Sequence, residues 1–219
     1  MNYGGSETQN THWVLESLQN KKNGYFIDIG CNQPKYGNNT YVLEKNFSWN
    51  GIVVEPNPQH FNDIQNMRTC TKILGRPIFD HNDFVDFMII ENTGLDGYSG
   101  IDETQNIHHR KMIVHQGVSK QPKFKIVKLQ AMCPKTLVKE YSVPNIFDYL
   151  KIDVEGAELK IIQNWPWDKA RPTLVSIESD PETTAKSVIK CMTEVNYKQV
   201  ENSHCNVNYE FFFQSLLTN

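Results

Sequence analysis

The stretch from Gly24 to Pro56 decides the fold, and it reads GYFIDIGCNQPKYGNNTYVLEKNFSWNGIVVEP. Two short apolar runs, at 25–29 and 52–54, flank a segment long enough to hold one helix. Neither run alternates between polar and apolar residues, which is typical of strands covered on both faces in a parallel sheet. We therefore expect a β-α-β unit at this point of the chain.

Acidic and small residues mark the ends of both predicted strands. Asp28 lies near the end of the first strand, and Gly30 follows it, where a glycine lets the backbone run close to a ligand. Glu55 ends the second strand, at the position where dinucleotide-binding folds use an acid to hold ribose hydroxyls. This arrangement predicts a nucleoside ligand.

The loop after the first strand restricts which nucleoside can bind. It lacks the G-x-G-x-x-G pattern, and it places the Asp28 carboxylate where a pyrophosphate would have to approach a helix N-terminus. A phosphate-free ribose ligand that carries positive charge on an amine and a sulfonium suits this turn, and S-adenosylmethionine is such a ligand. Two alternatives remain at this point: a nucleotide-sugar or dinucleotide enzyme on the same fold, and a catalytically silent binding module.

Four blocks of sequence, in order and with matching spacing, resemble the FkbM-like S-adenosylmethionine-dependent methyltransferases. The blocks are GYFIDIG at 24–30, NTYVLE at 39–44, WNGIVVEPNP at 49–58 and YLKIDVEGAE at 149–158. One block alone would be weak, because an acid and a glycine after a strand occur in many α/β proteins. The resemblance extends over roughly residues 23–213, which is nearly the whole chain.

The resemblance implies a single Rossmann-like class I methyltransferase domain over residues 1–219. We expect an α/β fold with a mostly parallel seven-stranded sheet, a closing antiparallel hairpin and an N-terminal helical segment at 1–23. The long polar segment at 91–121 is the expected acceptor lid, since long insertions in a compact domain are usually functional. The implied reaction is O-methylation of a small polar acceptor, for which we favour a sugar or glycan terminus, alone or within a larger glycan-modifying system.

Hydrophobic periodicity and turn residues predict the other elements. Strands are expected at 71–74, 84–90, 123–129, 149–154 and 173–177, with the closing pair near 197–201 and 207–213. Helices are expected at 11–18, 40–46, 59–67, 134–141, 156–164 and 183–196.

The predicted cofactor-binding residues follow the carboxyl ends of the strands. They are Asp28, Gly30, Asn32, Asn39, Thr40, Glu55, Asn57 and Asp153. Asn38 and Asn39 precede the helix predicted at 40–46, whose open N–H groups would face the cofactor carboxylate, although a helix-capping role would also explain these two asparagines. Asn57 has the same alternative, as the cap of the next helix. The resemblance implies that a polar segment before the first strand lies near the cofactor, so Gln9 and Asn10 either contact it or form a solvated helix start.

Four residues are candidates for catalysis and four for acceptor binding. The catalytic candidates are Asp153, Glu178, His108 and His109, and the acceptor candidates are Tyr98, Ser99, Arg110 and Glu155. Alternation along a strand would place Asp153 and Glu155 on one side, so that two carboxylates converge on the site of methyl transfer. Glu155 could instead accept hydrogen bonds from the N-terminal amides of the next helix. Either histidine could act as general base, because imidazole titrates near neutral pH, or could be an ordinary loop residue. Asp153 and Glu178 could share a divalent ion, but two acids do not make a metal site, and we predict no required metal.

Composition limits the possible partners and the compartment. A net charge of −3 and a pI near 6.2 give no electrostatic reason to bind nucleic acid or an anionic membrane. The five cysteines are scattered and form no C-x-x-C pair, which favours a reducing compartment. No apolar run approaches the length of a membrane span, and no signal peptide opens the chain. We expect a soluble protein of the cytoplasm or of a host-cell cytoplasm.

Overall fold

The central sheet of the computed structural model has seven strands in the order β3-β2-β1-β7-β8-β10-β9. The structure describes residues 8–69, 71–91, 94–105, 123–202 and 209–217. The strands are β1 (Tyr25–Ile29), β2 (Asn50–Val54), β3 (Thr71–Leu74), β7 (Ile146–Ile152), β8 (Arg171–Glu178), β9 (Tyr197–Val200) and β10 (Glu210–Ser215). Neighbours from β3 to β8 are parallel, whereas β10 is antiparallel to both β8 and β9. The predicted mostly parallel sheet with a closing antiparallel hairpin is confirmed.

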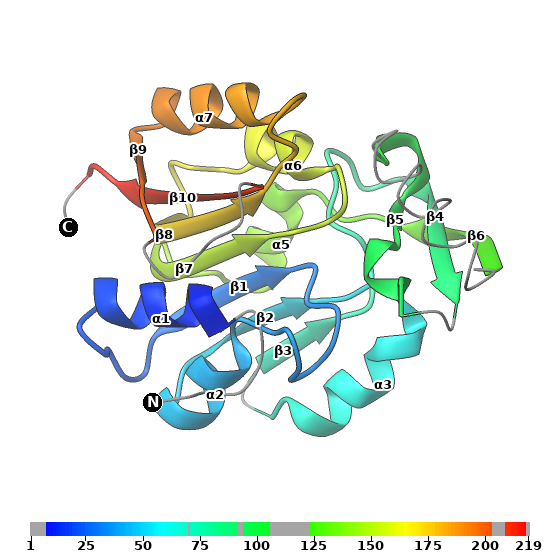
Figure 1. The fold of residues 1–219 in the computed structure, drawn as a ribbon, viewed down its shortest axis with the longest axis horizontal. Coiled ribbons are helices and arrows are strands. Elements are labelled where there is room, and N and C mark those ends of the chain that lie inside the picture. The colour runs from blue at the N-terminus through cyan, green and yellow to red at the C-terminus, as the bar shows by residue number, and fades with distance from the viewer. Residues whose placement is uncertain (1–7, 70, 92–93, 106–122, 203–208, 218–219) are drawn as a thin grey trace.

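Helices cover both faces of this sheet (Figure 1). One face packs against α1 (Thr8–Ser17), α2 (Tyr41–Phe47) and α3 (Pro58–Met67), and the other against α5 (Pro134–Glu140), α6 (Glu158–Asn164) and α7 (Ala185–Glu194). Successive residues of β1 serve opposite faces: Phe26 packs on the side of α1, and Ile27 and Ile29 pack on the side of α6. Both faces of the strands are therefore buried, which explains the unbroken apolar runs of the sequence. None of the helices in the described ranges is long and apolar enough to cross a membrane.

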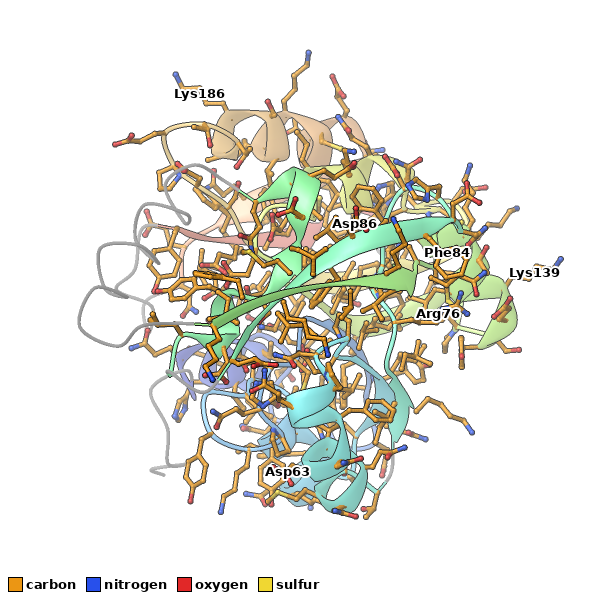
Figure 2. All side chains as sticks on the ribbon, turned by 90° about the vertical axis from the view of Figure 1, so that its right-hand side faces the viewer. Asp63, Arg76, Phe84, Asp86, Lys139 and Lys186 are labelled. Atoms are coloured by element: carbon orange, nitrogen blue, oxygen red, sulfur yellow. The ribbon has the colours of Figure 1, made fainter. Side chains whose placement is uncertain are left out.

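A second, smaller sheet lies beside the carboxyl ends of the central strands (Figure 1). It contains β4 (Phe84–Glu91), β5 (Gly100–Ile101) and β6 (Lys123–Gln130), with β4 antiparallel to both neighbours. Figure 2 looks onto this sheet, with Phe84 and Asp86 of β4 on the side toward the viewer. Two short 3-10 helices, η1 (Asp96–Tyr98) and η2 (Asp102–Thr104), adjoin β5. Together with β5 they lie in the described part of the lid predicted at 91–121, of which residues 92–93 and 106–121 lie outside the described ranges.

The turn after β7 differs from the prediction. The strand begins at Ile146 and ends at Ile152, whereas the helix α6 begins only at Glu158. Glu155 and Gly156 have φ angles of 62° and 121°, in the left-handed region that breaks a helix. A Cβ on Gly156 would lie 2.2 Å from the carbonyl oxygen of Thr104. Only glycine fits this position, so residue 156 belongs to a tight turn and not to the predicted helix.

The carboxyl ends of β1 and β7 touch through their backbones. The N–H of Asp153 donates to the carbonyl of Ile29 at 2.9 Å. Gly30 has a φ of 87°, and a Cβ at this residue would lie 1.6 Å from the carbonyl oxygen of Asp153. The glycine that sequence analysis associated with a ligand is therefore also required by the packing of two strand ends.

Gly30→Ala is expected to destabilise the chain by about 2–4 kcal/mol, because it combines a left-handed φ with a backbone collision. Urea unfolding measures this loss. Gly97→Ala is the matched control, since its Cβ would meet only the flexible end of Asn32 at 3.0 Å, and it should cost less than about 1 kcal/mol. Equal stabilities of the two variants would contradict the contact between the β1 and β7 ends.

Candidate functional site

A cavity of about 600 Å³ lies between the carboxyl ends of the central strands and the small sheet. This size is typical of a small-molecule site. The central strands contribute Ile29, Gly30, Val54, Glu55, Asp153 and Glu178 to its wall, and the small sheet and its connections contribute Phe87, Leu95, Asp96, Tyr98 and Ser99. Figure 1 shows that β1, β2 and β7 point their carboxyl ends toward this side. The cavity occupies the place where open α/β sheets bind ligands.

Glu55 is fixed at the end of β2, where it lines the cavity with 6% of its surface exposed. Its Oε2 accepts from the backbone N–H of Asn32 at 2.7 Å, and its Oε1 accepts from that of Asn57 at 2.7 Å. Burial raises the pKa of Glu55 to about 8, and the two backbone hydrogen bonds oppose this rise. The predicted ribose-binding carboxylate thus lies in the cavity wall and has a set orientation.

Asn39 presents a buried polar atom at the cavity. The residue lines the cavity with 1% of its surface exposed, and its Oδ1 has no hydrogen-bond partner among the described residues. Its backbone carbonyl accepts from the Thr11 hydroxyl at 2.7 Å, which ties the start of α2 to α1. Gln9 and Asn10 line the same cavity, and the Asn10 amide donates to the Glu210 carboxylate. An unpaired buried oxygen is costly, so a ligand donor at Asn39 would be favourable.

Asp28 and Thr40 are not among the residues that line the cavity. The Asp28 Oδ2 accepts from the Thr40 hydroxyl at 2.6 Å and from the Asn38 amide at 3.3 Å. Arg68, fully buried at the end of α3, donates to the Thr40 hydroxyl at 3.0 Å and to Glu44 at 2.6 Å. These groups form a buried polar network behind the turn that follows β1, and a direct cofactor contact of Asp28 or Thr40 stays a prediction. Sequence analysis missed Arg68, because nothing in its local pattern separates it from a surface arginine at a helix end.

Of the predicted cofactor residues Asn32 and Asn57, only Asn32 lines the cavity. The Asn57 Oδ1 accepts from the N–H of Gln59 at 3.0 Å, so its alternative role as the cap of α3 is confirmed. Its side-chain amide also donates to the Ser99 hydroxyl at 3.3 Å, and Asn57 is not among the cavity-lining residues. Asn32 lines the cavity, with a left-handed φ of 55°.

Three acids gather at the carboxyl ends of β7 and β8. Asp153, Glu155 and Glu178 all line the cavity, and their carboxylate oxygens lie within 4.8 Å of one another. The predicted convergence of Asp153 and Glu155 is present, but its predicted cause was wrong. Both residues lie beyond the end of β7, and the left-handed turn brings them together, not strand alternation. Groups of acids are common without an ion, so we assign no metal here, and the absence of a required metal stays a prediction.

Glu178 and Asp153 form a hydrogen-bonded pair of acids. Burial raises the pKa of Glu178 well above its usual value, and the charge of Asp153 and a hydrogen bond with it raise this pKa further. Burial also raises the pKa of Tyr98, with smaller contributions from Glu155 and Glu178. The predicted acceptor residue Tyr98 therefore lies within electrostatic reach of the predicted catalytic acids.

The N-terminal part of α3 holds the connection between β4 and β5 over the cavity. His60 of α3 lines the cavity, and its Nε2 lies 2.8 Å from the Asp96 Oδ2 of η1. The Ser99 hydroxyl donates to the Asp96 carbonyl at 2.7 Å and accepts from the N–H of Ile90 at 3.0 Å. Sequence analysis missed His60, although its place in the first turn after the Glu55 block was a usable signal. His108, His109 and Arg110 lie outside the described residues.

Comparisons with known proteins identify the family of the chain. A sequence profile described as the methyltransferase FkbM domain matches residues 28–199. Among solved structures, the METTL16 methyltransferase domain is similar, with a TM-score of 0.50 and 13% identity. The match covers 95% of this chain and 66% of that one, so the chain spans just under two thirds of the METTL16 domain.

A precorrin-6y C5,15-methyltransferase from Geobacter metallireducens is also similar, at a TM-score of 0.43 and 9% identity. That match covers 93% of this chain and 83% of the other. No curated protein gives a significant match. The likeness to METTL16 shows the fold, and the profile covers well over half of the sequence. The chain therefore belongs to the FkbM family of S-adenosylmethionine-dependent methyltransferases.

Proposed function

We propose that the protein methylates a hydroxyl group of a small polar acceptor, most simply a sugar or the terminal residue of a glycan. The observation that carries this proposal is the cluster of Asp153, Glu155 and Glu178 beside Tyr98 in the cavity wall. Carboxylates and a phenol can hold the hydroxyl groups of a sugar, and a carboxylate can accept the proton that a hydroxyl loses. The observed cavity also suits a small ligand better than a macromolecular surface.

The residues at β1 and β2 fit the cofactor. Glu55 offers a fixed carboxyl group for ribose hydroxyls, and the orphaned Oδ1 of Asn39 offers an acceptor for an ammonium group. Gly30, between them and Asp153, also lines the cavity. When bound, S-adenosylmethionine supplies a methyl group that its sulfonium has already activated.

The strand order assigns different parts of the cavity to the two ligands. Because β1 lies between β2 and β7, Glu55 stands on one side of Gly30, and Asp153 and Glu178 stand on the other. We assign the β2 side to the cofactor and the β7–β8 side to the acceptor. Asp153 takes the acceptor proton there, an effect worth on the order of 10²–10⁴ in rate. Holding the acceptor in line supplies much of the remaining rate enhancement.

Several further expectations belong to the same proposal. The chain works as a single methyltransferase domain, the segment at 91–121 encloses the acceptor, and His108, His109 and Arg110 contribute from that segment. The scattered cysteines support a site of action in the cytoplasm or a host-cell cytoplasm, and a glycan acceptor would fit a place in a larger glycan-modifying system. A dinucleotide enzyme is the main alternative. Both a methyltransferase and a dinucleotide enzyme would use an acid at the position of Glu55 to hold ribose hydroxyls.

Asn39→Ala should weaken binding of S-adenosylhomocysteine by about tenfold, because it removes an orphaned buried acceptor of a cavity-lining residue. Isothermal titration calorimetry measures the affinity. Asn46→Ala is the matched control, since Asn46 is exposed on α2, the helix that follows Asn39, and does not line the cavity. An unchanged affinity of Asn39→Ala, or binding of NAD in place of S-adenosylhomocysteine, would contradict the cofactor assignment.

Glu55 should make the chain less stable as the pH rises. Its pKa is 4.5 in a model peptide and about 8 in the fold, so the native state holds this proton more tightly. The contribution to stability is complete below about pH 4.5 and is lost as the pH rises toward 8. Between pH 5 and 8, wild type should lose about 1 kcal/mol more unfolding free energy per pH unit than Glu55→Gln. Urea unfolding at both pH values provides the measurement, and equal losses would argue against a buried, protonated Glu55.

Asp153→Asn should lower turnover by at least about 100-fold and leave affinity for S-adenosylhomocysteine within about threefold, because the group serves the acceptor. A panel of sugars and glycan termini, with methyl-labelled S-adenosylmethionine, first identifies an acceptor for wild type. Asp168→Asn is the control, because Asp168 is an exposed acid outside the cavity wall. Equal loss of turnover and cofactor affinity would move Asp153 to the cofactor side, and labelling of amines only would overturn O-methylation.

A further inference from the structure

Lys151 is a buried cation in the middle of the central sheet. It lies in β7, in register with Asp28 of β1 and Ser176 of β8, and only 4% of its surface is exposed. Burying an ammonium group is costly unless it is paired. Its Nζ donates to the Asp153 Oδ2 at 2.8 Å and to the carbonyl of Gly30 at 3.3 Å. This lysine therefore contacts both the predicted catalytic acid and the turn that adjoins the cofactor side.

Several acids of the described residues also lie near Asp153. Glu178 of β8 is hydrogen-bonded to it, Glu155 lies in the same turn, and Glu158 of α6 accepts from the N–H groups of Val154 and Gly156 at 2.9 Å and 3.1 Å. Two carboxyl groups in contact cannot both ionise easily, so the pair formed by Asp153 and Glu178 tends to keep one proton.

The position of Lys151 decides which acid holds that proton. Its ammonium group contacts the Asp153 carboxylate, and this charge–charge contact favours the ionised form of Asp153. Burial and the neighbouring acids raise the pKa of Glu178, which favours its protonated form. The hydrogen bond between them then runs from the Glu178 carboxyl group to the Asp153 carboxylate.

We infer that Lys151 is a positioning residue that keeps the negative charge on Asp153 and fixes this carboxylate at the cavity, so that Asp153 and not Glu178 takes the acceptor's proton. The inference rests on the proposed function, in which the acceptor is a hydroxyl group. In the proton-transfer step, the O–H bond of the acceptor breaks and its electron pair stays on oxygen. The proton forms a bond to Asp153, which becomes a neutral carboxyl group beside Lys151. Asp153 later releases this proton to solvent.

Carbon-13 NMR of the side-chain carboxyl groups tests this inference without acceptor or cofactor. The protein is labelled at the carboxyl carbons of aspartate and glutamate, and the Asp153 and Glu178 signals are assigned from Asp153→Asn and Glu178→Gln. In wild type at pH 7, Asp153 should be ionised and Glu178 protonated. In Lys151→Met, the midpoint of the Asp153 titration should rise by about one pH unit or more, since a neighbouring cation has been removed.

Lys160→Met is the matched control. Lys160 lies on α6 and pairs with Glu103 at 3.0 Å and Asp80 at 3.5 Å, both outside the cavity wall. It should leave the Asp153 titration unchanged. An Asp153 titration that is the same in wild type and Lys151→Met would overturn the inference. If Lys151→Met does not fold, wild type alone decides, because a protonated Asp153 beside an ionised Glu178 at pH 7 would overturn it equally.

Failure of this inference can be told apart from failure of the proposed function. Binding of S-adenosylhomocysteine to wild type, measured by calorimetry, reports on the cofactor assignment and does not depend on the state of Asp153. If S-adenosylhomocysteine binds and the Asp153 titration is the same in wild type and Lys151→Met, only the role of Lys151 is overturned. Absence of binding overturns the proposed function, whatever the titration shows.

Discussion

The contact between the carboxyl ends of β1 and β7 is the constraint on which the rest of the site depends. A backbone hydrogen bond joins Asp153 to Ile29, and Gly30 lies so close to the Asp153 carbonyl that no side chain fits. Lys151 donates to groups on both strands. Because of this contact, the turn on the cofactor side and the acids on the acceptor side cannot shift independently. A methyl transfer needs such a fixed relation, since reactivity falls steeply when the reacting atoms are misplaced.

The second general feature is the concentration of acids in a partly enclosed cavity. Glu55, Asp153, Glu155, Glu178 and Glu210 all line it. Burial raises the pKa of Glu55 and of Glu178, so the ionised forms of these two acids are disfavoured in the cavity. A cationic cofactor relieves part of this cost, and so does a neutral acceptor rich in hydroxyl donors. The same acids disfavour phosphorylated ligands, which agrees with the absence of a phosphate-binding glycine loop in the sequence.

Sequence analysis predicted the fold well, because unbroken apolar runs and their flanking acids are local signals of a parallel sheet. It also identified Gly30, Glu55, Asp153 and Glu178 as cavity residues, since each lies at or just after the end of a central strand. It could not place Asp28 within the buried network of Arg68, because that network joins residues far apart in the chain. Sequence analysis extended the strand to 154 and began the helix at 156, and so missed the turn around Glu155. The contact that requires a glycine at 156 comes from Thr104, which is distant in the sequence and gives no local signal. Lys151 was missed for a similar reason, because its burial and its contacts depend on both neighbouring strands.

A crystal structure of the protein with S-adenosylhomocysteine tests the central claim most directly. The account predicts that the ribose hydroxyls contact Glu55, that the amino group of the methionine part contacts Asn39, and that the sulfur faces the side of the cavity formed by Asp153 and Glu178. A ligand bound elsewhere, or one whose sulfur faces away from these two acids, would contradict it.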